Sequence, residues 1–575
     1  MKSCCGTLCL ILLGLVWLPA SAETWYVRPD GGTRNSANHK GQCDGKADAA
    51  YRGSGTNQHC AFNDVRYLWT DGTYTTNEGA GAPAWGWIGA GGDTYLIRGG
   101  PWRVGQSGSG PHDSLGLAGD PYGAGAPPPP SGTPAQHTRI LGENYESCGS
   151  QSKMTQLYGG YGVFQVLALN GAKNVDMQCI ELTRHSQCVI YGVPAVPGNC
   201  KTDFPIDDYA KNGITTDAGT QGILLQDVWI HGFTSRGIIG PIGGTITAKR
   251  VDIAYNGAAG WDFDDGKATP NVNGVINLSY VTIEWSGCNQ AYPGTGAISC
   301  YSQSSGGYGD GIGTPGGTCL TAHVDHSVFR YNTQDGYDML HNDTGNCSMS
   351  ITDSASYGNN GSQFKWGSND SPMIFTNNIV VANCLRLSAA MSGQPNTYNA
   401  HLADFCRAED AIALGFRNGG TVLMANNTIV TYSPTTFDVE CGDAGGCPAS
   451  TFTFKNNIVL GYDNPATYNL GGYAGGPGGF YLAHPIGKVL RSNNIYYGIR
   501  NMQLSTLFST EKYTDPKFAS QPRFAKEQDL DNFDFHLSPS SPALRSGARI
   551  PEVQSDHDGK PRPSTGNYDI GAFQN

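Results

Sequence analysis

Carboxylates and a lysine occupy matching places in successive repeats of this 575-residue chain. The stretch "YNTQDGYDM" contains Asp335 and Asp338, and the next repeat, "GNNGSQFKWG", has Lys365 where the first has Asp338. Aligned on its glycine, the preceding "YGDGIG" brings Asp310 over Asp335 and the small Gly313 into the place of Asp338. The repeat would therefore gather three carboxylates and one amine on neighbouring coils.

These residue types suit removal of a proton next to a carboxylate. Three close carboxylates repel one another unless a cation lies between them, and Ca²⁺ tolerates an irregular set of oxygen ligands better than Mg²⁺ does. A lysine beside a divalent cation has its ammonium form destabilised, which favours an amine able to take a proton. A metal ion that neutralises a substrate carboxylate, next to a base, assists proton abstraction from the adjacent carbon. We therefore expect a calcium site at Asp310, Asp335 and Asp338, with Lys365 as the base.

Strand alternation would turn these groups outward. Asp338 and Lys365 each lie between two large apolar residues, and side chains in a strand alternate between its two faces. If the apolar neighbours point inward, the aspartate and the lysine face solvent, on coils about 4.8 Å apart. Asp335, three residues before Asp338, must then lie in the preceding corner, which Gly336 would allow.

A repeated pattern predicts the fold that positions them. Asn-Asn with an isoleucine within the next two residues recurs, each time in a β-rich run, at Asn377–Asn378, Asn426–Asn427, Asn456–Asn457 and Asn493–Asn494. Uninterrupted repeats are about 23 to 30 residues long, the length of a solenoid coil. An antiparallel sandwich would show hairpin signals at shorter intervals. We therefore expect an all-β, right-handed, single-stranded parallel β-helix, in which the Asn-Asn motifs form structural ladders.

The ends of the chain differ from its repeats. Residues 1–22 resemble a signal peptide, with Lys2, an apolar run and the small residues Ala20-Ser21-Ala22. Residues 23–515 form the expected β-helix domain, capped near its start by an amphipathic helix in "CAFNDVRYLWTDGT". Residues 516–575 lose the repeat and are expected to be an irregular tail that packs on the last coils.

Composition indicates the compartment of the protein and argues against two classes of partner. Removing a signal peptide would leave 14 of the 17 cysteines, an even number that suits disulfides in a secreted protein, extracellular or periplasmic. Cys288 and Cys300, or Cys441 and Cys447, are close enough to close single loops. A net charge of −12 argues against nucleic acid and anionic membranes. A monomer is expected.

The corner and the "GxxFKxG" phrase one coil later resemble polysaccharide lyase family nine, the pectate-lyase-like group, over about residues 229–393. The resemblance implies calcium-assisted β-elimination on an acidic, uronate-containing polysaccharide. It assigns Lys365 as base and Asp310, Asp335 and Asp338 as calcium ligands. Gln334 stands where the family usually has another aspartate, so its amide oxygen would complete a site with one charge fewer.

Two further residues are candidates for substrate binding. Arg386, one coil beyond Lys365, could hold a substrate carboxylate through its guanidinium. Asp262 falls in the column of Asp338 two coils earlier and could extend the acidic face, although its segment "DFDDGK" is equally typical of a turn.

Two other functions fit the same scaffold. A glycoside hydrolase would use two carboxylates as acid and base, but the Gly-His-Gly and Arg-Ile-Lys phrases associated with β-helix polygalacturonases are absent. A non-catalytic carbohydrate-binding or adhesin solenoid would use the calcium site only to stiffen its coils.

Overall fold

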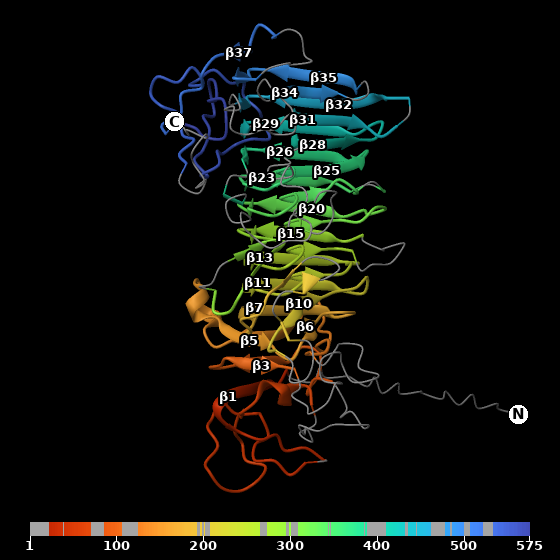
Figure 1. Cartoon of the computed structure of the whole chain (residues 1–575), viewed down its shortest axis with the longest axis vertical. Coiled ribbons are helices and arrows are strands. Elements are labelled where there is room, and N and C mark those ends of the chain that lie inside the picture. Colours follow the sequence, from red (N-terminus) through yellow and green to blue (C-terminus); the bar gives the residue numbers. More distant parts are fainter. Residues whose placement is uncertain are drawn as a thin grey trace, which may run out of the picture.

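The computed structural model is a long column of stacked parallel strands, running from β1 at one end to β37 at the other (Figure 1). It describes residues 22–37, 39–70, 86–105, 125–191, 196–197, 200–201, 207–264, 273–294, 298–300, 309–342, 344–345, 347–383, 386–387, 410–431, 435–443, 445–461, 478–482, 486–499, 507–520 and 533–575. The predicted signal peptide, apart from Ala22, lies outside the described residues.

Two parallel sheets form the column, which confirms the expected all-β parallel β-helix. The larger comprises β1 (Thr24–Gly32), β2 (Thr94–Ile97), β3 (Trp102–Val104), β4 (Thr138–Gly142), β5 (Thr155–Gly159), β7 (Lys173–Arg184), β11 (Gln221–His231), β13 (Thr245–Ala254), β15 (Val275–Ser279), β16 (Thr282–Glu284), β20 (Thr321–Asp325), β21 (Val328–Arg330), β23 (Met349–Thr352), β24 (Ala355–Tyr357), β26 (Pro372–Thr376), β27 (Ile379–Ala382), β29 (Thr421–Ala425), β30 (Thr428–Thr431), β32 (Cys447–Lys455), β33 (Ile458–Gly461), β35 (Ile486–Ser492), β36 (Ile495–Tyr497) and β37 (Lys512–Tyr513).

The second sheet carries the predicted site. It comprises β6 (Val163–Ala168), β10 (Ala210–Thr215), β12 (Ile238–Ile239), β14 (Trp261–Asp262), β19 (Ile312–Gly313), β22 (Tyr337–Met339), β25 (Phe364–Asn369), β28 (Asp410–Phe416), β31 (Thr435–Cys441) and β34 (Gly478–Leu482). Two antiparallel pairs lie outside these sheets: β8 (Ile190–Tyr191) with β9 (Val196–Pro197), and β17 (Cys288–Gln290) with β18 (Ile298–Cys300).

The helical segment near the N-terminus is shorter than the sequence predicts. It is a single 3₁₀ turn, η1 (Val65–Leu68), which buries Val65 and Leu68. Asp64 accepts a hydrogen bond from the backbone N–H of Arg66 and also binds its guanidinium, so the turn is closed locally. Two more 3₁₀ turns are η2 (Tyr145–Ser147) and η3 (Gln151–Lys153).

The Asn-Asn motifs bend the larger sheet. The first asparagine of each pair adopts a left-handed backbone, with φ of 55–57°, a conformation that asparagine tolerates better than most residues. The second is buried and joins the next coil: Asn457, for example, accepts from the side chain of Asn427 at 2.9 Å. This ladder satisfies polar groups inside the column.

The C-terminal segment covers one face of the later coils (Figure 1). Its apolar residues pack against outward side chains of β27, β30, β33 and β36; the cluster includes Phe518, Phe535, Leu537, Ile570 and Phe573 with Val381, Val430, Ile458, Leu460 and Ile495. The left-handed asparagines hold it in place: Asn456 Nδ2 donates to the carbonyl of Ala548 at 2.7 Å, and Asn426 Nδ2 to that of Asp569 at 3.0 Å. The segment therefore shields an apolar sheet face from water.

Disulfides close several loops of the described chain. Six are present: Cys43–Cys60, Cys148–Cys179, Cys188–Cys200, Cys288–Cys300, Cys319–Cys347 and Cys441–Cys447. Both pairs suggested by sequence proximity are among them. Within the described residues, no helix has the length and apolar character needed to cross a membrane.

Candidate active site

One outward column of the second sheet contains both the aspartate and the lysine. In the strand register, Asp338 on β22 lies beside Gly313 on β19 on one side and beside Lys365 on β25 on the other. The central part of this column contains, in order, Asp262, Gly313, Asp338, Lys365, Ala413 and Asp438. The neighbours of Lys365, Phe364 and Trp366, are buried in the core, so alternation turns the lysine outward.

Asp310 and Asp335 lie in the corners that precede these strands. The backbone N–H of Gly311 donates to the carbonyl of Asp335 at 2.8 Å, so the two corners stack. The N–H of Asp335 in turn donates to Oδ1 of Asp310 at 3.0 Å. Asp335 is almost completely buried, with 1% of its surface exposed.

The three carboxylates and the lysine form one cluster. Asp310, Asp335 and Asp338 each offer an oxygen, and these oxygens lie within 4.8 Å of one another. Lys365 Nζ lies 2.7 Å from Oδ2 of Asp335 and 3.9 Å from Oδ2 of Asp338. Its side chain is only 13% exposed, which weakens solvent screening of these charges.

Glycines make room for the cluster. A Cβ at Gly361 would lie 2.1 Å from Oδ1 of Asp335, so no other residue type fits there without moving the carboxylate. A Cβ at Gly313 would lie 3.1 Å from Oδ2 of Asp310, a tighter contact than a normal packing distance. Next to Gly361, the backbone N–H of Ser362 donates to Oδ1 of Asp335 at 2.6 Å.

Burial and crowding perturb the titration of the cluster. Burial raises the pKa of Asp310 well above its usual range, and the charges of Asp335 and Asp338 raise it further. Burial also raises the pKa of Asp338 to about 6, although the ammonium of Lys365 opposes the shift. For Lys365, burial lowers the pKa, but the attraction of Asp335 and Asp338 outweighs it, and the net shift is upward.

The directions of these pKa shifts indicate that the cluster has more negative than positive charge when its carboxyls are ionised. One ammonium faces three carboxylates, and two of these have pKa values raised by burial. An oxygen-only donor set of this kind suits a hard cation. The cluster therefore fits a metal ion chemically, and Lys365 already occupies part of the space between its carboxylates.

The other predicted residues lie at different positions. Gln334 is buried in the corner beside Asp335. Asp262 is paired with Arg236, whose Nε lies 2.6 Å from its Oδ2. The guanidinium of Arg386 lies over the rings of Tyr331, at 4.7 Å, and Trp285, at 5.7 Å.

Sequence reasoning missed the direct pairing of Lys365 with Asp335. It also missed the N–H of Ser362 and the close approach of Gly361. A small pair, Gly361-Ser362, stands in the corner just before β25, at the place that Gln334-Asp335 occupies one coil earlier. The absence of a Cβ at the first of these positions was the available signal.

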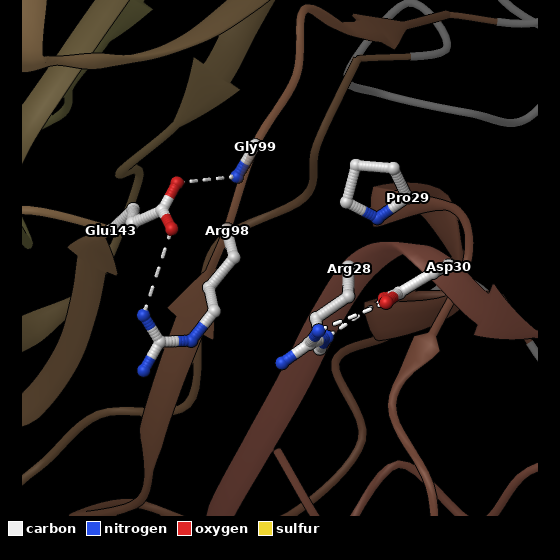
Figure 2. Close-up of a pocket in the computed structure, with 6 residues that line it drawn as sticks. All are labelled: Arg28, Pro29, Asp30, Arg98, Gly99 and Glu143. Carbon is white, nitrogen blue, oxygen red and sulfur yellow. Dashed lines mark hydrogen bonds and ion pairs between the residues drawn. The ribbon is translucent and has the colours of Figure 1, made fainter. Parts of the chain in front are cut away.

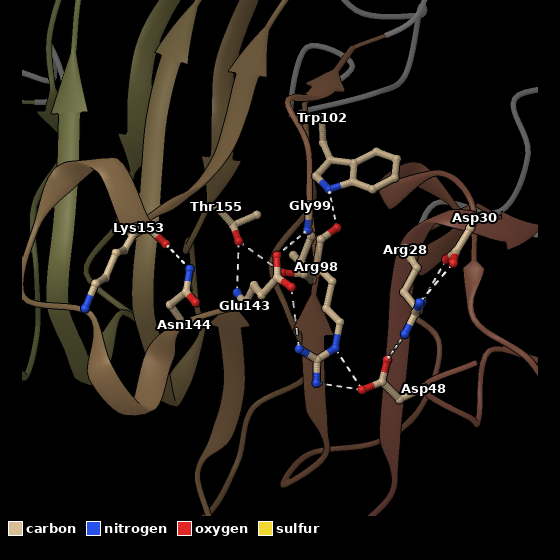
Figure 3. Close-up of polar contacts among 11 residues, drawn as sticks. Arg28, Asp30, Asp48, Arg98, Gly99, Trp102, Glu143, Asn144, Lys153 and Thr155 are labelled. Carbon is tan, nitrogen blue, oxygen red and sulfur yellow. Dashed lines mark hydrogen bonds and ion pairs between the residues drawn. The ribbon is translucent and has the colours of Figure 1, made fainter. Parts of the chain in front are cut away.

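A cavity lies near the N-terminal end of the column. It has a volume of about 370 Å³ and is lined by Arg28, Pro29, Asp30, Arg98, Gly99 and Glu143 (Figure 2). Both arginines are engaged by carboxylates: Asp48 bridges Arg28 and Arg98, and Asp30 pairs with Arg28 (Figure 3). Because these charges are matched, the Asp-Lys cluster is the stronger candidate for the active site.

The solved structures that are similar to this chain include two lyases. No protein-family model and no curated protein matches the chain. A solved structure described as the crystal structure of pectate lyase Pel9A is 12% identical, with a TM-score of 0.38 over 96% of each chain. A rhamnogalacturonan lyase is 12% identical, with a TM-score of 0.39 over 90% of this chain and 97% of the other. Both are polysaccharide lyases by description, and neither likeness assigns a role to a residue here.

Proposed function

We propose that this protein is a secreted polysaccharide lyase that cleaves an acidic, pectate-like polysaccharide by calcium-assisted β-elimination. One observation carries the proposal: Lys365 Nζ lies 2.7 Å from a buried carboxylate, in an outward cluster of three. Proton abstraction from the carbon next to a uronate carboxylate needs a base and, beside it, a cation that neutralises the carboxylate.

The reaction needs one proton acceptor and produces no net charge. Lys365 Nζ takes the proton from the carbon next to the uronate carboxylate. The electron pair of that C–H bond forms a carbon–carbon double bond as the bond to the glycosidic oxygen breaks. That oxygen leaves with a proton from solvent, and Lys365 then returns its own proton to solvent, so the products are a new chain end and an unsaturated uronate.

Asp335 positions the base. Its carboxylate is fixed by the N–H of Ser362 on one oxygen and by Lys365 on the other. In the metal-free cluster the raised pKa of Lys365 keeps the amine protonated. The lysine acts as a base only when another positive charge among the carboxylates destabilises its ammonium.

Asp310, Asp335 and Asp338 would hold that charge as a calcium ion, with the carboxamide of Gln334 as a further oxygen ligand. When bound, the ion would also supply a positive charge that neutralises the carboxylate of the substrate. The corner and strand origin of these ligands favours Ca²⁺, which accepts irregular oxygen geometries, over Mg²⁺. Arg386 and Asp262 are proposed to contact the polysaccharide on either side.

The disulfides are consistent with the proposed export of the protein. Six described cystines would be maintained in an oxidising compartment such as the periplasm or the extracellular space.

The test is the ultraviolet absorbance of the unsaturated product on a panel of acidic glycans, with calcium or with chelator. We expect a signal on at least one uronate polymer that chelator abolishes. New reducing ends without the absorbance would instead indicate a glycoside hydrolase. A folded protein with neither signal would support the non-catalytic solenoid.

A further inference from the structure

A buried arginine outside the proposed active site has no carboxylate partner among the described residues. Arg184, the last residue of β7, is 1% exposed. Its guanidinium donates to Oδ1 of Asn289 at 2.6 Å, to the carbonyl of Gln290 at 3.3 Å and to Sγ of Cys188 at 3.4 Å. All three acceptors are neutral. Within the described residues, Arg184 forms no ion pair with a carboxylate, and its Nε has no hydrogen-bond partner.

Such an arrangement is costly. A charged group removed from water is tolerated when it is paired or fully hydrogen-bonded. Burial lowers the pKa of Arg184 to about 10, and the charge of Asp207 offsets only part of this. The guanidinium nevertheless remains charged at neutral pH.

A small cavity lies next to this group. It has a volume of about 20 Å³ and is lined by Arg184 and Gly232 together with Thr183, His231, Tyr255, Gln290, Ala291, Tyr292, Pro293 and Gly294. A volume of this size holds one water-sized species. The loop closed by the Cys288–Cys300 disulfide forms one wall.

Gly232 opens the cavity. Extending the strand register places it between Arg184 on one coil and Tyr255 on the next. The column continues with aromatic rings, because Tyr255 stacks on Trp285 with centroids 6.0 Å apart. A Cβ at Gly232 would lie 3.6 Å from Oγ1 of Thr183 and 4.0 Å from Nε of Arg184. The missing side chain thus leaves space beside the unpartnered nitrogen.

We propose that this cavity binds a small monovalent anion of chloride size, held by Nε of Arg184. A water molecule could accept the same hydrogen bond, but it would leave the buried charge unmatched. Room for about one water-sized species favours a monatomic anion over a carboxylate. The site lies four coils before Asp335, roughly 19 Å along the column axis at about 4.8 Å per coil, and does not depend on the proposed lyase activity.

Bromide reports on the site directly. Crystals of the full chain grown in sodium bromide should show an anomalous peak in contact with Nε of Arg184. A water molecule there, without an anomalous signal, would overturn the proposal.

Thermal unfolding provides the solution test, with sodium chloride compared with sodium gluconate at equal ionic strength. We expect a higher melting temperature in chloride, because an ion that binds only the folded state stabilises it. Gly232→Ala should abolish the difference by filling the cavity. Gly171→Ala is the matched control, since φ is +70° there and +79° at Gly232, and its Cβ would meet nothing within 4 Å. Equal melting temperatures of the wild type in both salts would contradict the site, whether or not Gly232→Ala folds.

Discussion

Lys365 Nζ and Oδ2 of Asp335 lie 2.7 Å apart, although 30 residues separate them in the chain. The strand that carries the lysine stacks directly on the strand that follows the aspartate. The contact joins the proposed base to a proposed metal ligand, so without a metal ion the ammonium of Lys365 is the cation of the cluster. Both the proposed chemistry and the stability of this region therefore depend on which positive charge, the ammonium of Lys365 or a metal ion, lies among the carboxylates.

Replacing the lysine separates the two roles. Lys365→Ala leaves the carboxylate of Asp335 buried without its partner, which typically costs about 3–5 kcal/mol of unfolding free energy. Lys365→Arg keeps the positive charge but cannot act as a base, because arginine stays protonated. We expect both variants to lose about 10²-fold to 10⁴-fold of the lyase rate, and only Lys365→Ala to be strongly destabilised without metal. Denaturant unfolding and product absorbance measure the two effects, and an active Lys365→Arg enzyme would exclude the lysine as base.

Gly361 tests the space around Asp335. Gly361→Ala should displace the carboxylate, because its Cβ would lie 2.1 Å from Oδ1. Calcium affinity measured by calorimetry should fall by at least about tenfold, equivalent to about 1.4 kcal/mol. Gly316→Ala is the control, since its Cβ would meet nothing within 4 Å. Equal calcium affinity in both variants would show that Asp335 is not a ligand.

The cluster makes stability depend on pH when chelator is present. The pKa of Asp338 is about 6 in the folded protein, above the value of about 3.9 for an unfolded aspartate. Between these values the folded state binds more protons, so its stability falls as pH rises from about 4 to 6, and the raised pKa of Asp310 adds to the fall in the same direction. Asp338→Asn should flatten this slope in urea unfolding curves. A wild-type stability that rises across this interval would contradict the raised pKa.

The asparagines that hold the C-terminal segment can be tested separately from the site. Asn456 donates to the carbonyl of Ala548 at 2.7 Å and accepts from its N–H at 2.7 Å. Asn456→Gly keeps the left-handed backbone accessible and removes these side-chain bonds, together with the one that Nδ2 donates to Oδ1 of Asn426 at 3.1 Å. We expect faster limited proteolysis of residues 533–575, with lyase activity retained. Unchanged proteolysis would mean that the apolar contacts alone hold the segment.

Much of the fold and the column could be predicted from sequence. Asp338 and Lys365 lie between apolar residues with a period of two, and a buried coil interior fixes that alternation. The Asn-Asn repeat marked the corners because asparagine tolerates their left-handed backbone.

The remaining features depend on three-dimensional detail. The ion pair of Lys365 with Asp335 depends on the backbone path of the corner that precedes β22. The position of Arg386 over Tyr331 depends on packing between segments that are far apart in the chain. The hydrophobic pattern near Val65 suggested a helix, but the local Asp64–Arg66 contacts close only one turn. Local patterns carry little information about such contacts.

The most direct measurement is a crystal structure with calcium and an uncleaved oligouronate, obtained at a pH where turnover is slow. The account predicts an ion bound to Asp310, Asp335 and Asp338, with Lys365 Nζ moved from Asp335 to the carbon next to the uronate carboxylate. A cluster without an ion, in which Nζ still contacts Asp335 while the glycan binds elsewhere, would contradict it.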